Sequence, residues 1–315
     1  MPDRAFISLI LRVSGNVNAD AGVGTRIPLK KIITWNQEVR PFVSARCIRR
    51  CIRERLYEKG FSIDPLQMVG GQGGQLGDIG DPLQYVDDDL FGFLKPIEPP
   101  LHRSSPIKLS HIISLRHAEV KVEFAARFAR DFIATYEKGY PVPFEIELAE
   151  WLGKLNVVVS DRVGRFSDDE LSEDLKKQLG DQRELPKNER IGRLRGFLEV
   201  LLWEGWSFPR GAQSPSIPEF YYAIIGLSSR YVPIFSYIDV TDDGKLNVFL
   251  IENMQKICGQ LLDKLFIVDY KGGKCQVHTY VRRGEENIEV TKENFDLSAE
   301  TMKMIISETC SFIIR

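Results

Sequence analysis

The sequence predicts an α+β fold, a ferredoxin-like or RRM-like sheet that carries large insertions. A strand-type apolar run, Ala5–Val13, lies near the start of the 315 residues. An amphipathic helix follows it, and strand-type and helix-type segments then recur along the chain. The order strand, helix, strands, helix, strand is typical of a split βαβ sheet. We expect one elaborated domain over residues 1–315.

The first run, AFISLILRV, is rich in β-forming residues and is followed by the breakers Ser14-Gly15-Asn16. It therefore predicts a central strand that ends in a loop reaching about Ile27. The loop contains Asn18 and Arg26 among small residues that leave backbone N–H groups accessible. Such a loop could hold a phosphate or a sugar, although most loops of this composition are only turns.

The next segment predicts a helix that begins at Pro41, runs to about Lys59 and is stopped by Gly60. Its apolar side is formed by Cys47, Ile48, Cys51 and Ile52, and its opposite side by Arg46, Arg49, Arg50 and Arg53. Arginines on successive turns are spaced about 5 Å apart, so they can follow the phosphates of a single strand without reading bases. A row of arginines can also be a plain solvent face. Four neighbouring like charges repel one another, which favours an anionic partner.

Later segments are less specific. The glycine-rich stretch at 70–80 has neither the GK[ST] of a phosphate-binding loop nor a complete GxGxxG, so we expect an insertion loop. Residues 122–138 are predicted to be helical, and Phe144–Val159 to be two strands around a turn near Gly153, a projecting hairpin. Residues 191–203 predict a second amphipathic helix, and residues 219–238 return to strand character.

Charge and chemistry narrow the function. The net charge of −2 and the isoelectric point near 6.2 argue against a protein coated in basic surface for duplex DNA. Residues 40–59 are locally basic and residues 76–98 locally acidic. This distribution suits a subunit that binds phosphates and contacts a like neighbour, or simply two solvated faces.

The five cysteines form no CxxC and the four histidines no metal-binding pattern, so we expect no metal and no cofactor. Arg12 interrupts the only early apolar run, which predicts a cytoplasmic protein without a membrane span.

Five segments, in order along the chain, together resemble the CRISPR-associated DevR family, the Cas-seven backbone subunits of type I Cascade complexes, and subtype I-B most of all. The helix resembles the guide-binding helix of that family, which begins with an aromatic residue and Ser and continues with basic pairs. The segments are Arg40–Arg53 (RPFVSARCIRRCIR), Asp87–Leu94 (DDDLFGFL), Arg103–Pro106 (RSSP), Val159–Phe166 (VSDRVGRF) and Arg210–Ser214 (RGAQS).

The resemblance implies a hand-like subunit. Its RRM-like palm would comprise about residues 1–60 and 162–315, its helical finger insertion about 60–140, and its β-hairpin thumb about 141–161. The chain would be a non-catalytic protein that binds the crRNA guide, presents it to target DNA and packs head to tail with further copies of itself. Its other partners would be the large, small, guide-capping and guide-processing Cascade subunits. The RNA-binding residues carried over are Asn18, Arg26, Ser44, Arg46, Arg49, Arg50, Arg53, Arg103, Arg210, Gln213 and Ser214.

Two other functions remain open at this point. A ribonuclease of the wider RAMP superfamily would cleave target RNA through a carboxylate in the first loop, where Asp20 is the candidate. A general RRM-type single-strand binder would carry paired aromatic residues in an RNP string, and the sequence contains no such string.

Overall fold

The computed structural model describes residues 2–17, 22, 24–69, 74–95, 100–127, 142–209, 216–283 and 286–315. The strands are β1 Arg4–Gly15, β2 Arg26–Ile27, β3 Lys31–Ile33, β4 Val39–Val43, β5 Gln67–Val69, β6 Gln75–Gly77, β7 Phe93–Lys95, β8 Leu101–Arg103, β9 Ile107–Leu109, β10 Ile112–Ser114, β11 Lys121–Arg127, β12 Val142–Ser160, β13 Glu219–Ser228, β14 Lys264–Asp269, β15 Lys274–Arg283 and β16 Glu286–Asp296. The helices are α1 Ala45–Glu58, α2 Val86–Phe91, α3 Glu173–Leu179, α4 Lys187–Glu199, α5 Val248–Cys258 and α6 Ala299–Ile313, with short turns η1 Asp168–Glu170, η2 Val200–Glu204, η3 Ile234–Tyr237 and η4 Gly259–Leu261.

A large sheet organises the molecule, and its main path runs β16-β15-β14-β13-β1-β12-β10-β4-β3. As predicted, β1 is central: it pairs antiparallel with β12 on one side and with β13 on the other. Alternate residues of β1 enter different clusters, Leu9 and its neighbours on one face and Ile10 on the other. A strand buried on both faces needs a continuous apolar sequence, which explains the run that begins at Ala5.

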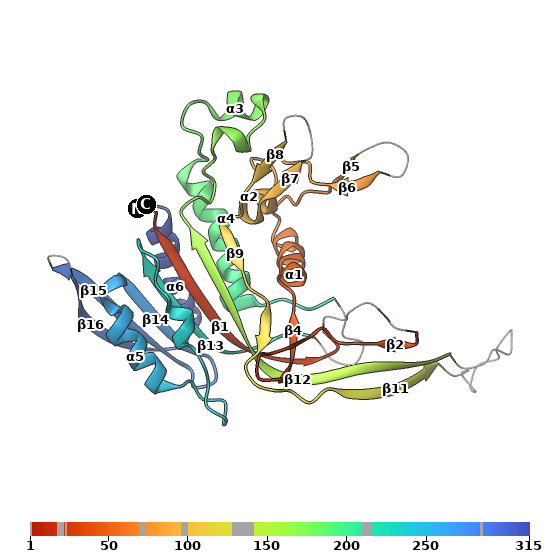
Figure 1. Cartoon of the computed structure of the whole chain (residues 1–315). Coiled ribbons are helices and arrows are strands. Elements are labelled where there is room, and N and C mark those ends of the chain that lie inside the picture. The colour runs from red at the N-terminus through yellow and green to blue at the C-terminus, as the bar shows by residue number, and fades with distance from the viewer. Residues whose placement is uncertain are drawn as a thin grey trace.

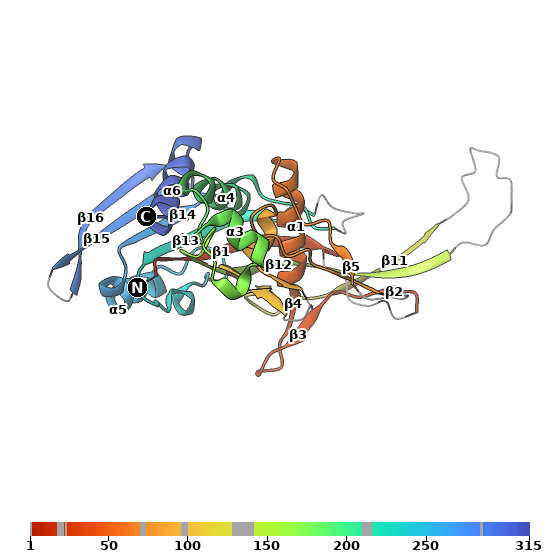
Figure 2. The same ribbon diagram turned by 90° about the horizontal axis from the view of Figure 1, so that it is seen from above.

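Helices cover both faces of this sheet (Figure 1, Figure 2). On one face α1, α4 and α6 contribute Ile48, Phe197 and Ile305 to the larger apolar cluster. On the other face α5 contributes Met254 to a second cluster, which also contains Ile10 of β1. Helix α1 is therefore held against the sheet by its apolar side, and its opposite side is available for other contacts.

Several segments differ from the sequence predictions. Helix α1 begins at Ala45 instead of Pro41, because Pro41 lies in β4 and pairs with Lys31 of β3. Within 122–138, the described residues up to 127 belong to the strand β11 and not to a helix. The insertion at about residues 60–140 was predicted to be helical, but its described part contains the strands β5 to β11 and only the six-residue helix α2.

Residues 144–159 do not form two strands around a turn. They lie within β12, an unbroken strand of 19 residues, and the projecting hairpin is instead formed by β11 with β12. Gly153 lies inside β12 opposite Leu11 and Ser114, and a Cβ atom there would lie 2.6 Å from a methyl carbon of Ile112. The glycine permits close approach of neighbouring strands and does not mark a turn.

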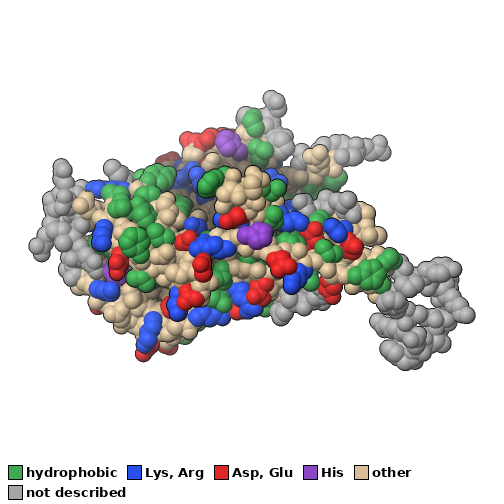
Figure 3. Space-filling view, turned by 60° about the horizontal axis from the view of Figure 1, so that its bottom comes forward, with side chains coloured by type: hydrophobic (Ala, Val, Ile, Leu, Met, Phe, Trp, Pro, Cys, Tyr) green, Lys and Arg blue, Asp and Glu red, His purple; other side chains and the backbone are tan. Residues whose placement is uncertain are grey.

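Charges of both signs are mixed over the surface. On the face in Figure 3, lysines and arginines lie among aspartates and glutamates and form no field of one sign. In the described residues, no helix is both long and apolar enough to cross a membrane.

Candidate nucleic-acid interface

The start of α1 is fixed by two side chains. The Ser44 hydroxyl, at the N-cap, accepts a hydrogen bond from the Cys47 N–H at 3.3 Å. The His111 Nδ1 atom accepts the Ala45 N–H at 2.9 Å, and the His111 ring stacks on Phe42. Free N–H groups at a helix start need such acceptors, so Ser44 and His111 hold the first turn in place. The functional prediction for Ser44 therefore falls on a residue that already has a structural role.

The four predicted arginines of α1 divide into two pairs. Arg50 bonds Glu54 of the next turn at 3.0 Å, and Arg53 bonds the buried Asp87 carboxylate at 2.7 Å. Arg46 is exposed and, within the part of the chain that the structure describes, forms neither an ion pair nor a hydrogen bond. Arg49 likewise lacks a carboxylate among the described residues. From the sequence, the four arginines were predicted to act together as one row. In the structure, only Arg46 and Arg49 of the four keep an uncompensated charge.

Arg49 is the most unusual of the four. Its Nε atom is buried and has no hydrogen-bond partner among the described residues. Burial lowers its pKa, and the positive charges of Arg53 and Arg46 lower it further. The guanidinium carbon lies 6.0 Å from the centre of the Phe91 ring, which gives only weak compensation. A bound anion at this point would supply the missing acceptor and the missing negative charge.

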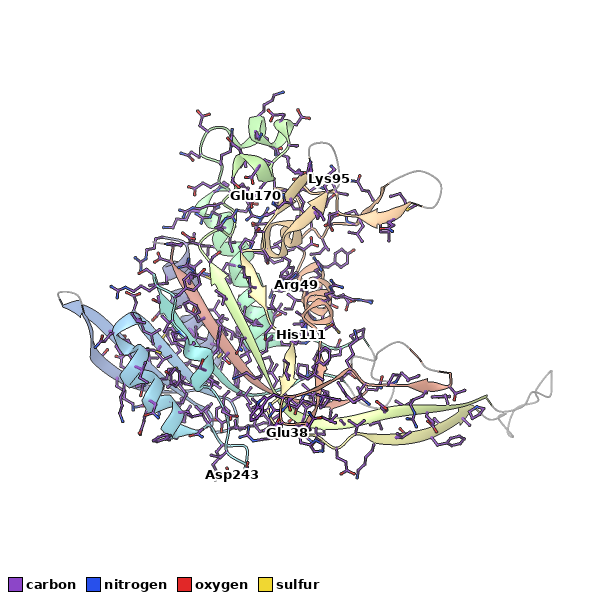
Figure 4. All side chains as sticks on the ribbon, in the orientation of Figure 1. Glu38, Arg49, Lys95, His111, Glu170 and Asp243 are labelled. Carbon is purple, nitrogen blue, oxygen red and sulfur yellow. The ribbon has the colours of Figure 1, made fainter. Side chains whose placement is uncertain are left out.

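Helix α1 lies between two groups of elements. Figure 1 shows α2 and β5 to β8 beyond one end of α1, and the long hairpin of β11 and β12 beyond the other. Arg49 lies on the helix, and His111 lies near its first turn (Figure 4). A strand of nucleic acid that runs along α1 would therefore have one of these groups at each end of the helix.

Of the contacts predicted in the first loop and in the late loop, the structure describes only Arg26. Arg26, in β2, is exposed and bonds Glu145 of β12 at 2.8 Å, so it lies alongside the β11–β12 hairpin. Asn18 and the proposed ribonuclease residue Asp20 lie outside the described residues. The same holds for Arg210, Gln213 and Ser214.

Arg103 does not lie at the interface, and this corrects the sequence-based assignment. Its side chain is fully buried and forms ion pairs of 2.7 Å with Asp89 and with Glu170. It also donates to three backbone carbonyls, of Asp89, Arg162 and Arg165. A guanidinium with every donor directed into the protein has none left for a phosphate, so Arg103 is a structural residue.

Arg103 belongs to a buried ionic network that sequence reasoning missed. Asp89 is its centre: the carboxylate accepts from Arg103, from Arg193 at 3.1 Å and from the Gly164 N–H at 3.0 Å. The network joins α2, β8, α4 and the turn after β12. The resembling segments DDDLFGFL, RSSP and VSDRVGRF meet here. In the sequence, Gly92 was one sign that the chain packs closely at this point. Its φ is positive, and a Cβ atom there would clash with the Arg103 carbonyl, so only glycine fits.

A second acidic group lies beside this network. One carboxylate oxygen from each of Asp64, Asp78 and Asp88 falls within 4.8 Å of the others, close enough to share a cation. Each carboxylate also accepts a backbone N–H. Burial, with the charges of Asp64 and Asp87, raises the pKa of Asp88 to about 8. A proton on Asp88 would reduce the repulsion among the three carboxylates, as a bound metal ion would.

Comparison with solved structures places this fold in a known class. A chain of a structure titled CRISPR RNA-guided surveillance complex, pre-nicking, superposes with a TM-score of 0.59 at 12% identity, covering 97% of this chain and 100% of that chain. A chain of a second CRISPR RNA-guided surveillance complex has a TM-score of 0.45 at 14% identity, covering 82% of each chain. The first likeness shows that the fold is that of a subunit found in such a complex.

The family follows from the sequence match. The model of the CRISPR-associated negative auto-regulator DevR/Csa2 family matches residues 81–244, a little over half of the chain. No curated protein matches the sequence. The chain belongs to the DevR/Csa2 family, as the resemblance predicted.

Proposed function

We propose that this protein is a non-catalytic, cytoplasmic subunit of a type I CRISPR Cascade complex that binds the crRNA guide by its backbone. The observation that carries the proposal is the uncompensated charge of Arg46 and Arg49 on α1, with a buried Arg49 Nε that lacks an acceptor among the described residues. Family membership and the fold of a surveillance-complex subunit support the same function. The guide would present its bases to target DNA, so that base pairing and not the protein reads the sequence.

The arrangement of elements supports an RRM-like palm. The antiparallel order β13-β1-β12-β9, with α1 and α4 packed in one apolar cluster, is the order of a split βαβ sheet. In this proposal the palm comprises about residues 1–60 and 162–315, together with β9 and the part of β12 that pairs with β1. The fingers are the insertion that begins near residue 60, and the thumb is the β11–β12 hairpin. Further copies, packed head to tail, and the large, small, guide-capping and guide-processing subunits would complete the complex.

The test removes the two uncompensated charges. The double variant Arg46→Gln/Arg49→Gln should bind a guide-length RNA at least about tenfold more weakly, because it loses two phosphate contacts. The matched control is Arg55→Gln on the same helix, where the arginine is already paired with Glu58 and Glu204. Binding is measured by fluorescence anisotropy, and folding by circular dichroism. Equal affinity of both variants for the RNA would contradict the proposed role of α1.

A further inference from the structure

The β3–β4 hairpin ends in an exposed indole. Trp35 is 95% exposed and Ile33, two residues earlier, is 70% exposed. The turn is ordered by its own bonds, since the Thr34 N–H donates to the Glu38 carbonyl and the Gln37 N–H to the Thr34 carbonyl, each at 3.0 Å. Figure 2 shows the hairpin projecting from the body of the protein. An ordered, exposed tryptophan is a typical interface anchor.

A pocket of matching character lies between α5 and the sheet. Its volume is about 730 Å³, and Tyr222, Leu246 and Ile267 contribute apolar surface. Val248, at the first turn of α5, lines it and is 63% exposed. Figure 3 shows hydrophobic side chains gathered at the left of the molecule, in the region of α5. The pocket has the size of a ligand site and can bury an aromatic ring.

The charges around this pocket also suit an indole. Its lining includes four lysines, at positions 245, 271, 274 and 292, and the two acids Glu252 and Asp269. Three of the lysines pair with Asp243, Glu219 and Asp296, so among the described residues Lys292 is the ammonium group without an ion pair. An ammonium group beside an aromatic face is attractive, and tryptophan is the best partner for it. A bound tryptophan would thus combine apolar burial with favourable contacts at the rim.

One chain cannot place its own hairpin in its own pocket. Strand β3 is the last strand at one edge of the main sheet path, whereas the pocket is built on β13 to β16 toward the other edge. The strands β4, β10, β12 and β1 lie between them. Two different complementary surfaces on one chain make a heterologous contact, which continues from copy to copy and need not close.

We propose that Trp35 of one copy inserts into the α5 pocket of the next copy. This inference rests on the proposed function, because the contact needs RNA to hold the two copies together. One tryptophan buries only about 150–250 Å², whereas a stable interface needs about 1,200–2,000 Å². The contact is too small to join free copies. It becomes effective when RNA holds two copies side by side at high local concentration.

The first test measures assembly on RNA. Trp35→Ala should load a long guide RNA with fewer copies at the same protein concentration, shifting the loading midpoint by at least about fivefold. Its affinity for an RNA that accommodates only one copy should be unchanged. Val248→Trp, which fills the mouth of the pocket from an exposed position, should reproduce the defect. The control is Tyr231→Ala, another exposed aromatic residue, which does not line the pocket.

The second test identifies the contact. Trp35→Cys and Val248→Cys proteins, mixed with long RNA and a short bismaleimide, should yield a 35–248 crosslink between copies by mass spectrometry. Met68→Cys, at a similarly exposed position, replaces Val248→Cys as the control.

Three results would overturn the inference. The first is normal loading of long RNA by Trp35→Ala. The second is an equal loss of affinity for the one-copy RNA, which would make Trp35 an RNA contact. The third is a 35–68 crosslink as strong as the 35–248 crosslink. If the unaltered protein binds neither RNA, the proposed function fails as well, so the two failures are distinguishable.

Discussion

In the proposed function, Arg49 would serve binding at the expense of stability. A buried donor without an acceptor costs about 1–3 kcal/mol relative to a satisfied one, and the neighbouring charges of Arg53 and Arg46 add repulsion. The free protein therefore holds Arg49 in an unfavourable state that an anion would relieve. This is the expected signature of a binding residue, and a merely solvent-exposed arginine would not have it.

Replacing Arg49 by methionine should separate stability from binding. Arg49→Met keeps the packing of the side-chain stem and removes the unsatisfied donor, so the free energy of unfolding should rise by about 1 kcal/mol. The same variant should bind guide RNA more weakly. Urea unfolding and RNA titration measure the two effects. Arg50→Met is the control, and its stability should change by less than about 0.5 kcal/mol because Arg50 is exposed. A less stable Arg49→Met protein would refute this account.

The arginines also show where sequence reasoning stopped. The helical spacing of Arg46, Arg49, Arg50 and Arg53 correctly predicted that they share the side of α1 opposite its apolar residues. It could not show which of them have partners, because Asp87 approaches Arg53 from a segment 34 residues away. Arg103 was misassigned for the same reason: its partners Asp89 and Glu170 are distant in sequence.

At the scale of elements, the buried ionic network fastens the inserted segment to the sheet. Asp89 of α2 and Arg103 of β8 belong to the insertion, whereas Arg193 belongs to α4 and Glu170 to the turn η1. Helix α2 also helps to position the arginines of α1, because Phe91 and Asp87 both contact them. Breaking the network should therefore disturb folding before it disturbs any contact with RNA.

Arg103→Met tests this structural role. Removing Arg103 leaves Asp89 with Arg193 alone and Glu170 with Arg162 alone, so two buried carboxylates lose part of their compensation, which should lower the free energy of unfolding by about 3–5 kcal/mol. The folded fraction should keep its affinity for guide RNA. Arg116→Met is the control, because that arginine is half exposed and pairs with Asp239 at the surface. A stable Arg103→Met protein with weak RNA binding would restore the original assignment.

Element types were predictable where local pattern decides them. The apolar run of β1 and the amphipathic period of α1 are local properties, and both elements appear where expected apart from the start of α1. The segment around Gly153 was misread because a glycine required by close strand approach looks, in sequence, like a glycine required by a turn. Only the neighbouring strand, which brings Ile112 against it, distinguishes the two.

For the molecule as a whole, the sequence revealed charge clusters but not their use. The acidic run at 76–98 was interpreted either as a surface for a neighbouring copy or as a solvated face. Instead, Asp87, Asp88 and Asp89 are buried, and two of them bond arginines of the same chain. In the basic segment 40–59, the described basic side chains other than Arg46 and Arg49 each pair with a carboxylate, so the unpaired charge of that segment lies at these two arginines.

This small residual charge predicts how binding should respond to salt. Each phosphate contact to a single strand contributes about 0.7 to the slope of log affinity against log salt concentration. Arg46→Gln should reduce the magnitude of that slope by about 0.7, and equally for RNAs of unrelated sequence, since the side chain would touch only backbone. Arg50→Gln should change it less, because Arg50 is already paired with Glu54. Titrations of both variants at several salt concentrations, each with two unrelated RNAs, measure these slopes. A loss that depended on RNA sequence would mean that α1 reads bases, and the protein would then be a sequence-specific binder in its own right.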